Sequence, residues 1–164
     1  MTEPLVGVVM GSASDWDTMQ HCAQQVEAFG VPFETRVLSA HRTPKELAAW
    51  IEDAESRGVE VFIAAAGMAA ALPGVVAAHT TRPVLGVPME SKLAGGLDSL
   101  LSMVQMPGGI PVGVLAVGRA GAVNSAILAA QILGRSHPEF DEGVRKHREA
   151  KASEILADPD PSQA

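Results

Sequence analysis

The stretch LVGVVMGSASDW, residues 5–16, has the pattern of a buried β-strand that turns directly into a helix. Its first part is apolar without alternating polar side chains, which is typical of a strand buried on both faces of a sheet. Gly11 permits a sharp turn. Beyond the turn, apolar residues recur at helical spacing from Trp16 to Phe29, and Gly30 suits the position after a helix end. We therefore predict a strand followed by a helix.

Strands and helices continue to alternate along the rest of the chain. Thr43 and Glu46 form a capping-box pattern around Pro44, which predicts that a helix begins there. Such alternation predicts βαβ units, with a parallel sheet covered by helices on both faces. We expect the remaining strands at 33–38, 59–66, 83–88 and 111–117, and the remaining helices at 43–57, 120–134 and 138–156.

The composition limits both the size of the fold and the kinds of partner. The 164 residues suit one compact domain and show neither a linker nor a repeat, so we expect a single domain over 1–164 with a frayed tail at 158–164. The formal net charge of −7 argues against binding to nucleic acid. It leaves room for a small anionic ligand, because a few local cations suffice for that.

The sequence also lacks the patterns of export and of membrane insertion. No apolar run approaches the roughly 20 residues that a membrane-spanning helix needs. Met1 is followed by Thr-Glu-Pro rather than by a basic and then apolar signal segment. Cys22 is the only cysteine, so no internal disulfide can form. We expect a cytoplasmic protein with no membrane partner.

Residues with chemical potential follow the predicted strands, where the carboxyl ends of a parallel sheet meet. Ligands of open α/β sheets bind outside these ends, near a topological switch point. The stretches that fall there are Gly11 to Asp15, Ser39 to Thr43, Gly67 to Leu72, Pro88 to Gly96 and Gly118 to Asn124.

The first of these stretches, GSASD, offers hydroxyls and a carboxylate beside a helix N-terminus. Ser12 and Ser14 lie where free N–H groups favour an anion, and Asp15 suits a diol such as a ribose. The alternative is structural: Ser14 caps the helix and Asp15 only complements the helix dipole. The stretch is neither a Walker loop nor a G-x-G-x-x-G fingerprint.

The second stretch, SAHRTP at 39–44, combines a phosphate-binding pattern with a proton carrier. Arg42 can bind a phosphate with two parallel hydrogen bonds, and Ser39 can add another. His41 titrates near neutral pH, so it can donate and accept a proton. The alternative is an ordinary surface histidine and arginine before a capped helix.

The third stretch, AAAGMAAALPG at 64–74, contains no titratable group. Its small side chains allow backbone amides to approach a ligand and would form a dry wall, although tight packing at a Gly-Ala seam explains them equally well. The Pro-Gly-Gly at 107–109 fits either a mobile lid or a simple turn. The histidines show no H-x₃-H pattern and Cys22 stands alone, so we expect no metal site.

Taken together, these stretches resemble one known family, the class I N5-carboxyaminoimidazole ribonucleotide mutases, or PurE family, of purine biosynthesis. The resemblance covers nearly all of 5–134 in order. The matching motifs are GSASDW, SAHRTP, ALPGVVAAHTTRPVLGVP, LDSLLSMVQMPGGIPVG and AGAVNSAILAAQIL.

The resemblance implies a fold, a reaction and roles for individual residues. It implies a flavodoxin-like three-layer αβα sandwich with a five-stranded parallel sheet, assembled as a homo-octamer. The substrate would be N5-carboxyaminoimidazole ribonucleotide, and the reaction would move its carboxyl group from N5 to C4 by decarboxylation and recarboxylation, with no metal, ATP or biotin as cofactor. His41 would be the catalytic acid–base, and the substrate-binding residues would be Ser12, Ser14, Asp15, Ser39, Arg42, Gly67, Ala69 and Leu72.

The chain departs from the family pattern at one place. Where the family usually reads GGAAHLPG, residues 67–74 read GMAAALPG, so that Met68 replaces a glycine and Ala71 replaces a histidine. No role of that second histidine is available here. We interpret it as auxiliary, because moving one carboxyl group needs only one proton carrier.

Two other functions compete with the mutase. The first is a carboxylase that uses free carbon dioxide, as class II relatives do, but these tend to have lysine at the position of Arg42 and lack the Thr-Pro that follows it here. The second is a non-catalytic nucleotide-binding module of the flavodoxin or receiver type. A receiver would need an aspartate after the third strand, where this chain has Ala66 and Gly67.

Overall fold

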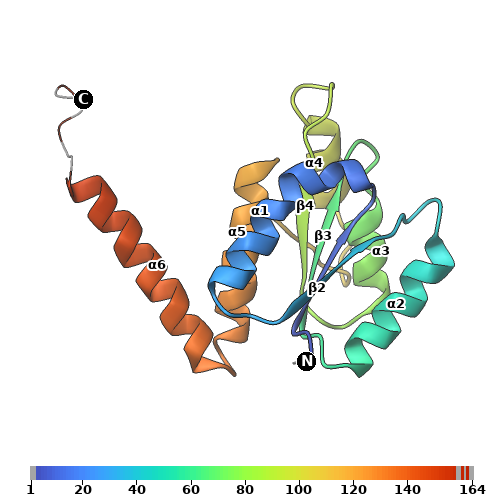
Figure 1. Cartoon of the computed structure of the whole chain (residues 1–164). Coiled ribbons are helices and arrows are strands. Elements are labelled where there is room, and N and C mark those ends of the chain that lie inside the picture. The colour runs from blue at the N-terminus through green and yellow to red at the C-terminus, as the bar shows by residue number, and fades with distance from the viewer. Residues whose placement is uncertain (1–2, 158–159, 161, 163–164) are drawn as a thin grey trace.

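Five parallel strands form a single sheet in the order β2–β1–β3–β4–β5. The computed structural model describes residues 3–157, 160 and 162, and Figure 1 shows its arrangement. This order places the topological switch point between β1 and β3, and it confirms the predicted flavodoxin-like α/β fold. The strands are β1 (Val6–Met10), β2 (Phe33–Val37), β3 (Val61–Ala66), β4 (Val84–Pro88) and β5 (Gly113–Val114).

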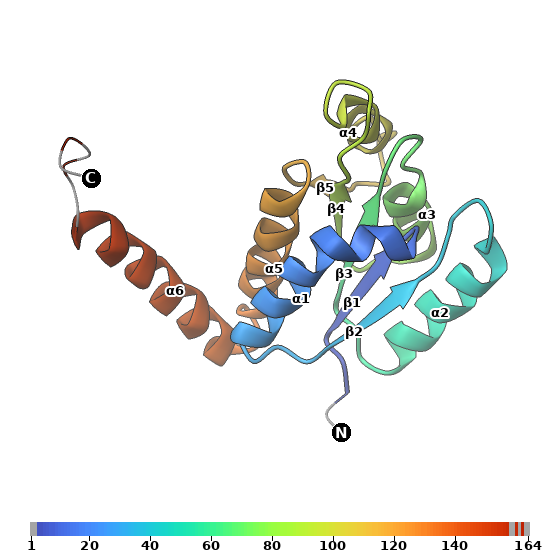
Figure 2. The same ribbon diagram turned by 45° about the horizontal axis from the view of Figure 1, so that its top comes forward.

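Helices cover both faces of the sheet (Figures 1 and 2). On one face, α1 (Trp16–Ala28) and α5 (Arg119–Leu133) pack against each other and against one hydrophobic core. On the other face, α2 (Pro44–Ser56) and α3 (Leu72–His79) enclose a second core, into which α4 (Leu97–Val104) inserts Met103. The inner strands β1, β3 and β4 are buried along their whole length, as the continuous apolar runs predicted.

The last helix, α6 (Pro138–Ala157), begins against α5 and then extends away from the sheet (Figure 1). Only Phe140 and Val144 are buried among its residues. Its bounds agree with the predicted helix at 138–156. Most of the tail predicted at 158–164 lies outside the described residues. Within the part of the chain that the structure describes, none of the helices has the length and apolar character of a membrane span.

Two predicted helix ends are confirmed at glycines. Gly30 has φ +70° and its N–H donates to the Glu27 carbonyl, while Val31 N–H donates to Val26 at 3.2 Å, which closes α1 in a left-handed turn. Gly58 has φ +102° and ends α2 in the same manner. Both positions need the positive φ that glycine adopts without a steric penalty.

The predicted capping box of α2 is wrong. Thr43 makes no side-chain cap; instead its Oγ1 donates to the Ser39 carbonyl at 3.2 Å and accepts the Ser39 N–H at 2.8 Å. The threonine therefore closes the loop before the helix rather than the helix itself. A capping box does occur at Ser12 and Asp15, around the short 3₁₀ helix η1 (Ala13–Asp15).

Three further elements differ from the expectation. Helices α3 and α4 were not predicted. Helix α3 is apolar on all sides and thus has no helical period, and α4 follows Gly96, whose left-handed backbone conformation is unusual before a helix. Strand β5 has two residues instead of the predicted seven, because Pro111 has no N–H to donate and the chain soon leaves the sheet toward α5. Trp16, expected on the buried face of α1, is 41% exposed.

The chain crosses tightly from β5 to α5. A Cβ on Gly121 would lie 1.7 Å from the carbonyl oxygen of Ala116. Backbone atoms on both sides are held by the sheet and by α5, so neither can withdraw cheaply. The close approach explains why a glycine stands within the first turn of an otherwise alanine-rich helix.

We predict that Gly121→Ala lowers the free energy of unfolding by about 3 kcal/mol or more, measured by urea denaturation. Helix propensity alone would favour alanine here, so the sign of the effect tests the steric argument. Gly108→Ala is the matched control, because nothing lies within 4 Å of a Cβ at that position. That variant should change stability by less than about 0.5 kcal/mol. Equal stability of the two variants would contradict the close approach.

Candidate active site

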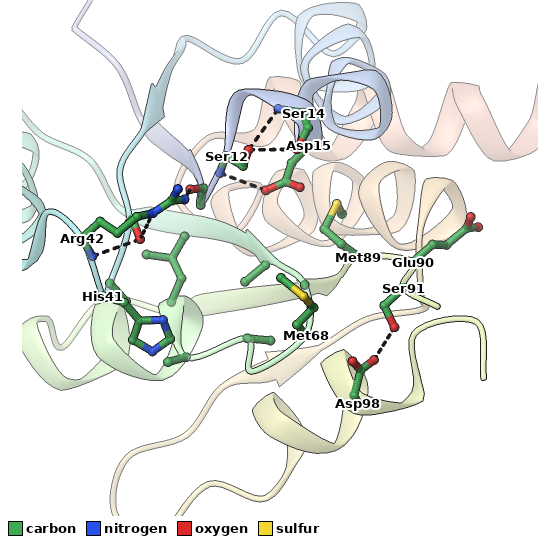
Figure 3. Close-up of a pocket in the computed structure, with 18 of the residues that line it drawn as sticks. Ser12, Ser14, Asp15, His41, Arg42, Met68, Met89, Glu90, Ser91 and Asp98 are labelled. Carbon is green, nitrogen blue, oxygen red and sulfur yellow. Dashed lines mark hydrogen bonds between the residues drawn. The ribbon is translucent and has the colours of Figure 1, made fainter. Parts of the chain in front are cut away.

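A pocket with a cavity volume of about 920 Å³ lies at the carboxyl ends of β1, β2, β3 and β4 (Figure 3). This is the size of a site for one nucleotide-like ligand. The structure brings together around it almost every residue singled out in the sequence. Those that line it are Ser12, Ser14, Asp15, Ser39, His41, Arg42, Gly67 and Leu72; Ala69 is exposed but does not line the pocket.

The loop after β1 is ordered by its own side chains. Ser12 N–H donates to Asp15 Oδ2 at 3.1 Å, and Ser14 N–H donates to Ser12 Oγ at 3.3 Å. The two serine hydroxyls lie 2.8 Å apart. Ser12, rather than the suggested Ser14, is therefore the capping residue. Ser14 keeps its hydroxyl at the pocket, so the structural explanation of this serine as a cap is wrong.

Burial raises the pKa of the Asp15 carboxyl above its ordinary value. The hydrogen bond from Ser12 N–H and the nearby positive charge of Arg42 act in the opposite direction, but they offset the desolvation only in part. A carboxylate accepts about four hydrogen bonds, and the loop supplies few of them. Asp15 can therefore accept further hydrogen bonds, for example from the hydroxyls of a sugar.

Arg42 joins the loop after β2 to the loop after β1. Its Nη2 donates to the Gly11 carbonyl at 2.9 Å, and its Nε donates to Ser39 Oγ at 3.3 Å. Ser39 Oγ also accepts the Arg42 backbone N–H at 3.2 Å, which fixes the base of the side chain. These bonds use one edge of the guanidinium. The other edge keeps its N–H groups for a ligand such as a phosphate.

His41 is exposed and makes no hydrogen bond or ion pair with any of the residues that the structure describes. In Figure 3 its ring lies beside the Arg42 side chain and apart from Ser12 and Asp15. An imidazole without a protein partner can give both of its nitrogens to a ligand. The arrangement therefore places the group that can carry a proton beside Arg42, which can hold a phosphate, and leaves the imidazole free for a ligand.

The wall of the pocket between His41 and Met89 is made of small and apolar residues. Gly67, Ala70, Ala71 and Leu72 line it, and none of them titrates. Ala71 stands at the start of α3, and no side chain caps that helix. The site thus has a polar half and a dry half.

Sequence reasoning placed the stretch Pro88 to Gly96 at this edge but assigned no role to its residues. In the structure Met89 forms part of the apolar wall, and Ser91 donates its hydroxyl to Asp98 at the start of α4 (Figure 3). The stretch has no recognisable motif, so only its place after a buried strand pointed to the pocket. The further lining residues of this region are Glu90, Lys92 and Leu93.

Comparison with known proteins identifies the family to which this chain belongs. The AIR carboxylase family model matches residues 5–154. The chain belongs to the AIR carboxylase (PurE) family. It is 54% identical over 160 residues to the N5-carboxyaminoimidazole ribonucleotide mutase of Pseudomonas aeruginosa, with 98% of each chain covered. It is 53% identical over 159 residues to the protein of that name from Escherichia coli, with 97% of this chain and 94% of the relative covered.

The fold comparison gives the same family. The crystal structure of PurE from Treponema denticola matches with a TM-score of 0.86 at 29% sequence identity, covering 94% of this chain and 96% of that one. Within the described residues of this AIR carboxylase family member, no three histidine, cysteine or acidic side chains are grouped as metal ligands would be.

We predict that Asp15→Asn raises the urea midpoint of unfolding at pH 7. Because the pKa of Asp15 is higher in the folded protein than its ordinary value of 3.8, folding disfavours the charged form, and the stability that the neutral form supplies is lost as pH rises through the folded pKa. The gain from asparagine should therefore shrink when unfolding is measured near pH 4.

Asp17→Asn is the matched control for this comparison. Asp17 is an exposed carboxylate in the first turn of α1, where its charge complements the helix dipole. Its replacement should not raise stability at pH 7. A stabilising effect of Asp17→Asn equal to that of Asp15→Asn would contradict the burial argument.

Proposed function

We propose that this chain is an N5-carboxyaminoimidazole ribonucleotide mutase, and that His41 is its acid–base catalyst. The observation that carries the proposal is one pocket in which a partner-free imidazole faces a set of sugar-phosphate ligands beside an apolar wall. The identity of more than 50% to mutases over nearly the full chain supports the same conclusion. The reaction is an isomerisation and needs no group outside the pocket.

The polar half of the pocket holds the ribonucleotide. The free edge of the Arg42 guanidinium binds the 5′-phosphate, with Ser39 and the serines of the first loop nearby. Asp15 accepts hydrogen bonds from the ribose hydroxyls. Its raised pKa fits this role, since a ligand that donates hydrogen bonds restores part of the solvation that burial removes.

The first chemical step breaks the bond between N5 and the carboxylate carbon. The electron pair of that bond returns to the nitrogen, carbon dioxide leaves, and protonated His41 delivers a proton to the nitrogen. The product of this step is the aminoimidazole ribonucleotide with a neutral imidazole beside it. The apolar wall around Gly67 and Ala70 keeps water out and holds the uncharged carbon dioxide near the ring.

The second step forms the new carbon–carbon bond. The electron-rich C4 of the ring attacks the carbon dioxide and gives the carboxylate, and the proton on C4 then passes to neutral His41. The imidazole ends protonated, as it began, so one residue serves both steps and the overall reaction needs no added acid or base. This is why Ala71, where relatives have a histidine, does not prevent turnover in this proposal.

We further propose that the chain is a single domain that works as a homo-octamer in the cytoplasm. The outer face of α4 exposes Leu97, Leu101 and Val104, and α6 extends away from the sheet with Ile155 and Leu156 exposed. Apolar side chains on projecting elements are typical of surfaces that pack against other subunits. The location follows from a substrate that is made and used inside the cell.

We predict that His41→Asn lowers kcat by about 1,000-fold or more while substrate affinity stays within about tenfold, because only proton transfer is removed. The assay follows isomerisation of the carbamate substrate without added ATP or metal. His79→Asn is the matched control, since His79 is exposed at the end of α3 that lies away from the pocket. An active His41→Asn enzyme, or an equal loss in the control, would refute this role of His41.

A further inference from the structure

Met68 holds an unfavourable backbone conformation at the edge of the pocket. Its φ is +55°, in the left-handed region that residues with a Cβ adopt reluctantly. Its side chain is 70% exposed, so burial of the side chain does not explain why the conformation persists. Other contacts must hold this residue in place.

Ser99 of α4 supplies the main contact. Its side chain is fully buried, and Oγ accepts the Met68 backbone N–H at 2.9 Å across 31 residues of sequence. Ser102, one turn later, donates to the Met68 carbonyl at 3.2 Å, but its single proton has a closer acceptor in the Asp98 carbonyl at 2.7 Å. Ser99 therefore carries the greater part of the attachment.

Ser99 is itself held firmly. Its N–H donates to Asp98 Oδ1 at 2.9 Å, and the same carboxylate oxygen accepts the Ser91 hydroxyl. The hydrogen bond from Ser91 lowers the pKa of Asp98, so the carboxylate stays ionised as an acceptor. Met103, almost completely buried, anchors α4 in the core below. The first turn of α4 thus connects the two loops that form the dry half of the pocket.

We propose that Ser99 is a positioning residue: it holds Met68 in its left-handed conformation and thereby places the apolar wall formed by residues 67–72 next to the migrating carboxyl group. This inference rests on the proposed function. Without the hydrogen bond, Met68 relaxes to negative φ, which rotates the peptide groups on both sides of it. Gly67 packs beside Met89, since a Cβ built at Gly67 would lie 3.3 Å from the Met89 Cβ, and the rotated peptide groups change the shape of the wall.

The expected effect falls on the chemical step rather than on binding. The groups proposed to hold the sugar phosphate, Asp15 and Arg42, lie on other loops, and among the described residues their hydrogen bonds are made within the loops after β1 and β2. We expect Ser99→Ala to lower kcat by about tenfold or more, because a displacement of about 1 Å in a reacting group can cost about 100-fold in rate. KM should change by less than about threefold.

Two variants separate positioning from a general loss of stability. Ser102→Ala makes the same substitution one turn away and should lower kcat much less than Ser99→Ala. Met68→Gly places at position 68 a residue that adopts positive φ freely, so the double variant Ser99→Ala/Met68→Gly should recover most of the lost kcat. If Ser99→Ala does not fold, Ser99→Cys keeps the volume with a weak acceptor and serves in its place.

Hydrogen exchange of the Met68 amide gives a readout that does not depend on activity. The amide should exchange slowly in the wild-type protein and at least about tenfold faster in Ser99→Ala. Unchanged exchange, or a loss of kcat that Met68→Gly does not restore, would overturn the inference. A wild-type protein without mutase activity would instead refute the proposed function, while the exchange experiment would still test how Ser99 holds Met68.

Discussion

The parallel pairing of β1 with both β2 and β3 is the constraint on which the site depends. Val9 and Met10 lie opposite Arg36 and Val37 on one side and opposite Ala64 and Ala65 on the other, so three strands end at one edge. The loops that follow them are far apart in sequence and meet only there. Arg42 then ties two of these loops together through its hydrogen bond to the Gly11 carbonyl. A different strand order would separate Ser12 and Asp15 on the first loop from His41 and Arg42 on the second.

The pocket concentrates features that cost stability, and the two hydrophobic cores compensate for them. Asp15 is a carboxylate whose charge is disfavoured by burial, and Met68 carries a left-handed backbone. Asp15 is held by a hydrogen bond from Ser12 in its own loop, and Met68 by one from Ser99 of α4. Such features concentrate at functional sites, because the rest of the fold supplies the stability that they lack. In the proposed mechanism the polar half binds the ribonucleotide, while the apolar half limits the access of water.

The sequence was most informative where one local pattern determines one structure. Continuous apolar runs located β1, β3 and β4, and the glycines at 30 and 58 located two helix ends. It was least informative where structure depends on distant contacts. Helix α3 has no amphipathic period, Thr43 closes a loop instead of capping its helix, and β5 ends early because the chain soon leaves the sheet toward α5. Ser99 lies within the matching motif LDSLLSMVQMPGGIPVG, but nothing in that pattern indicates that its side chain supports a loop 31 residues away.

The central claim is that the carboxyl carbon never leaves the pocket during turnover. The direct test is a single-turnover reaction with excess enzyme, in which N5-carboxyaminoimidazole ribonucleotide labelled with ¹³C in its carboxyl group reacts in buffer that contains unlabelled bicarbonate. Mass spectrometry then measures the label in the 4-carboxy product. We predict that the product keeps the ¹³C of the substrate. A product whose carboxyl carbon comes from the bicarbonate pool would contradict the mutase account and indicate a carboxylase that uses free carbon dioxide.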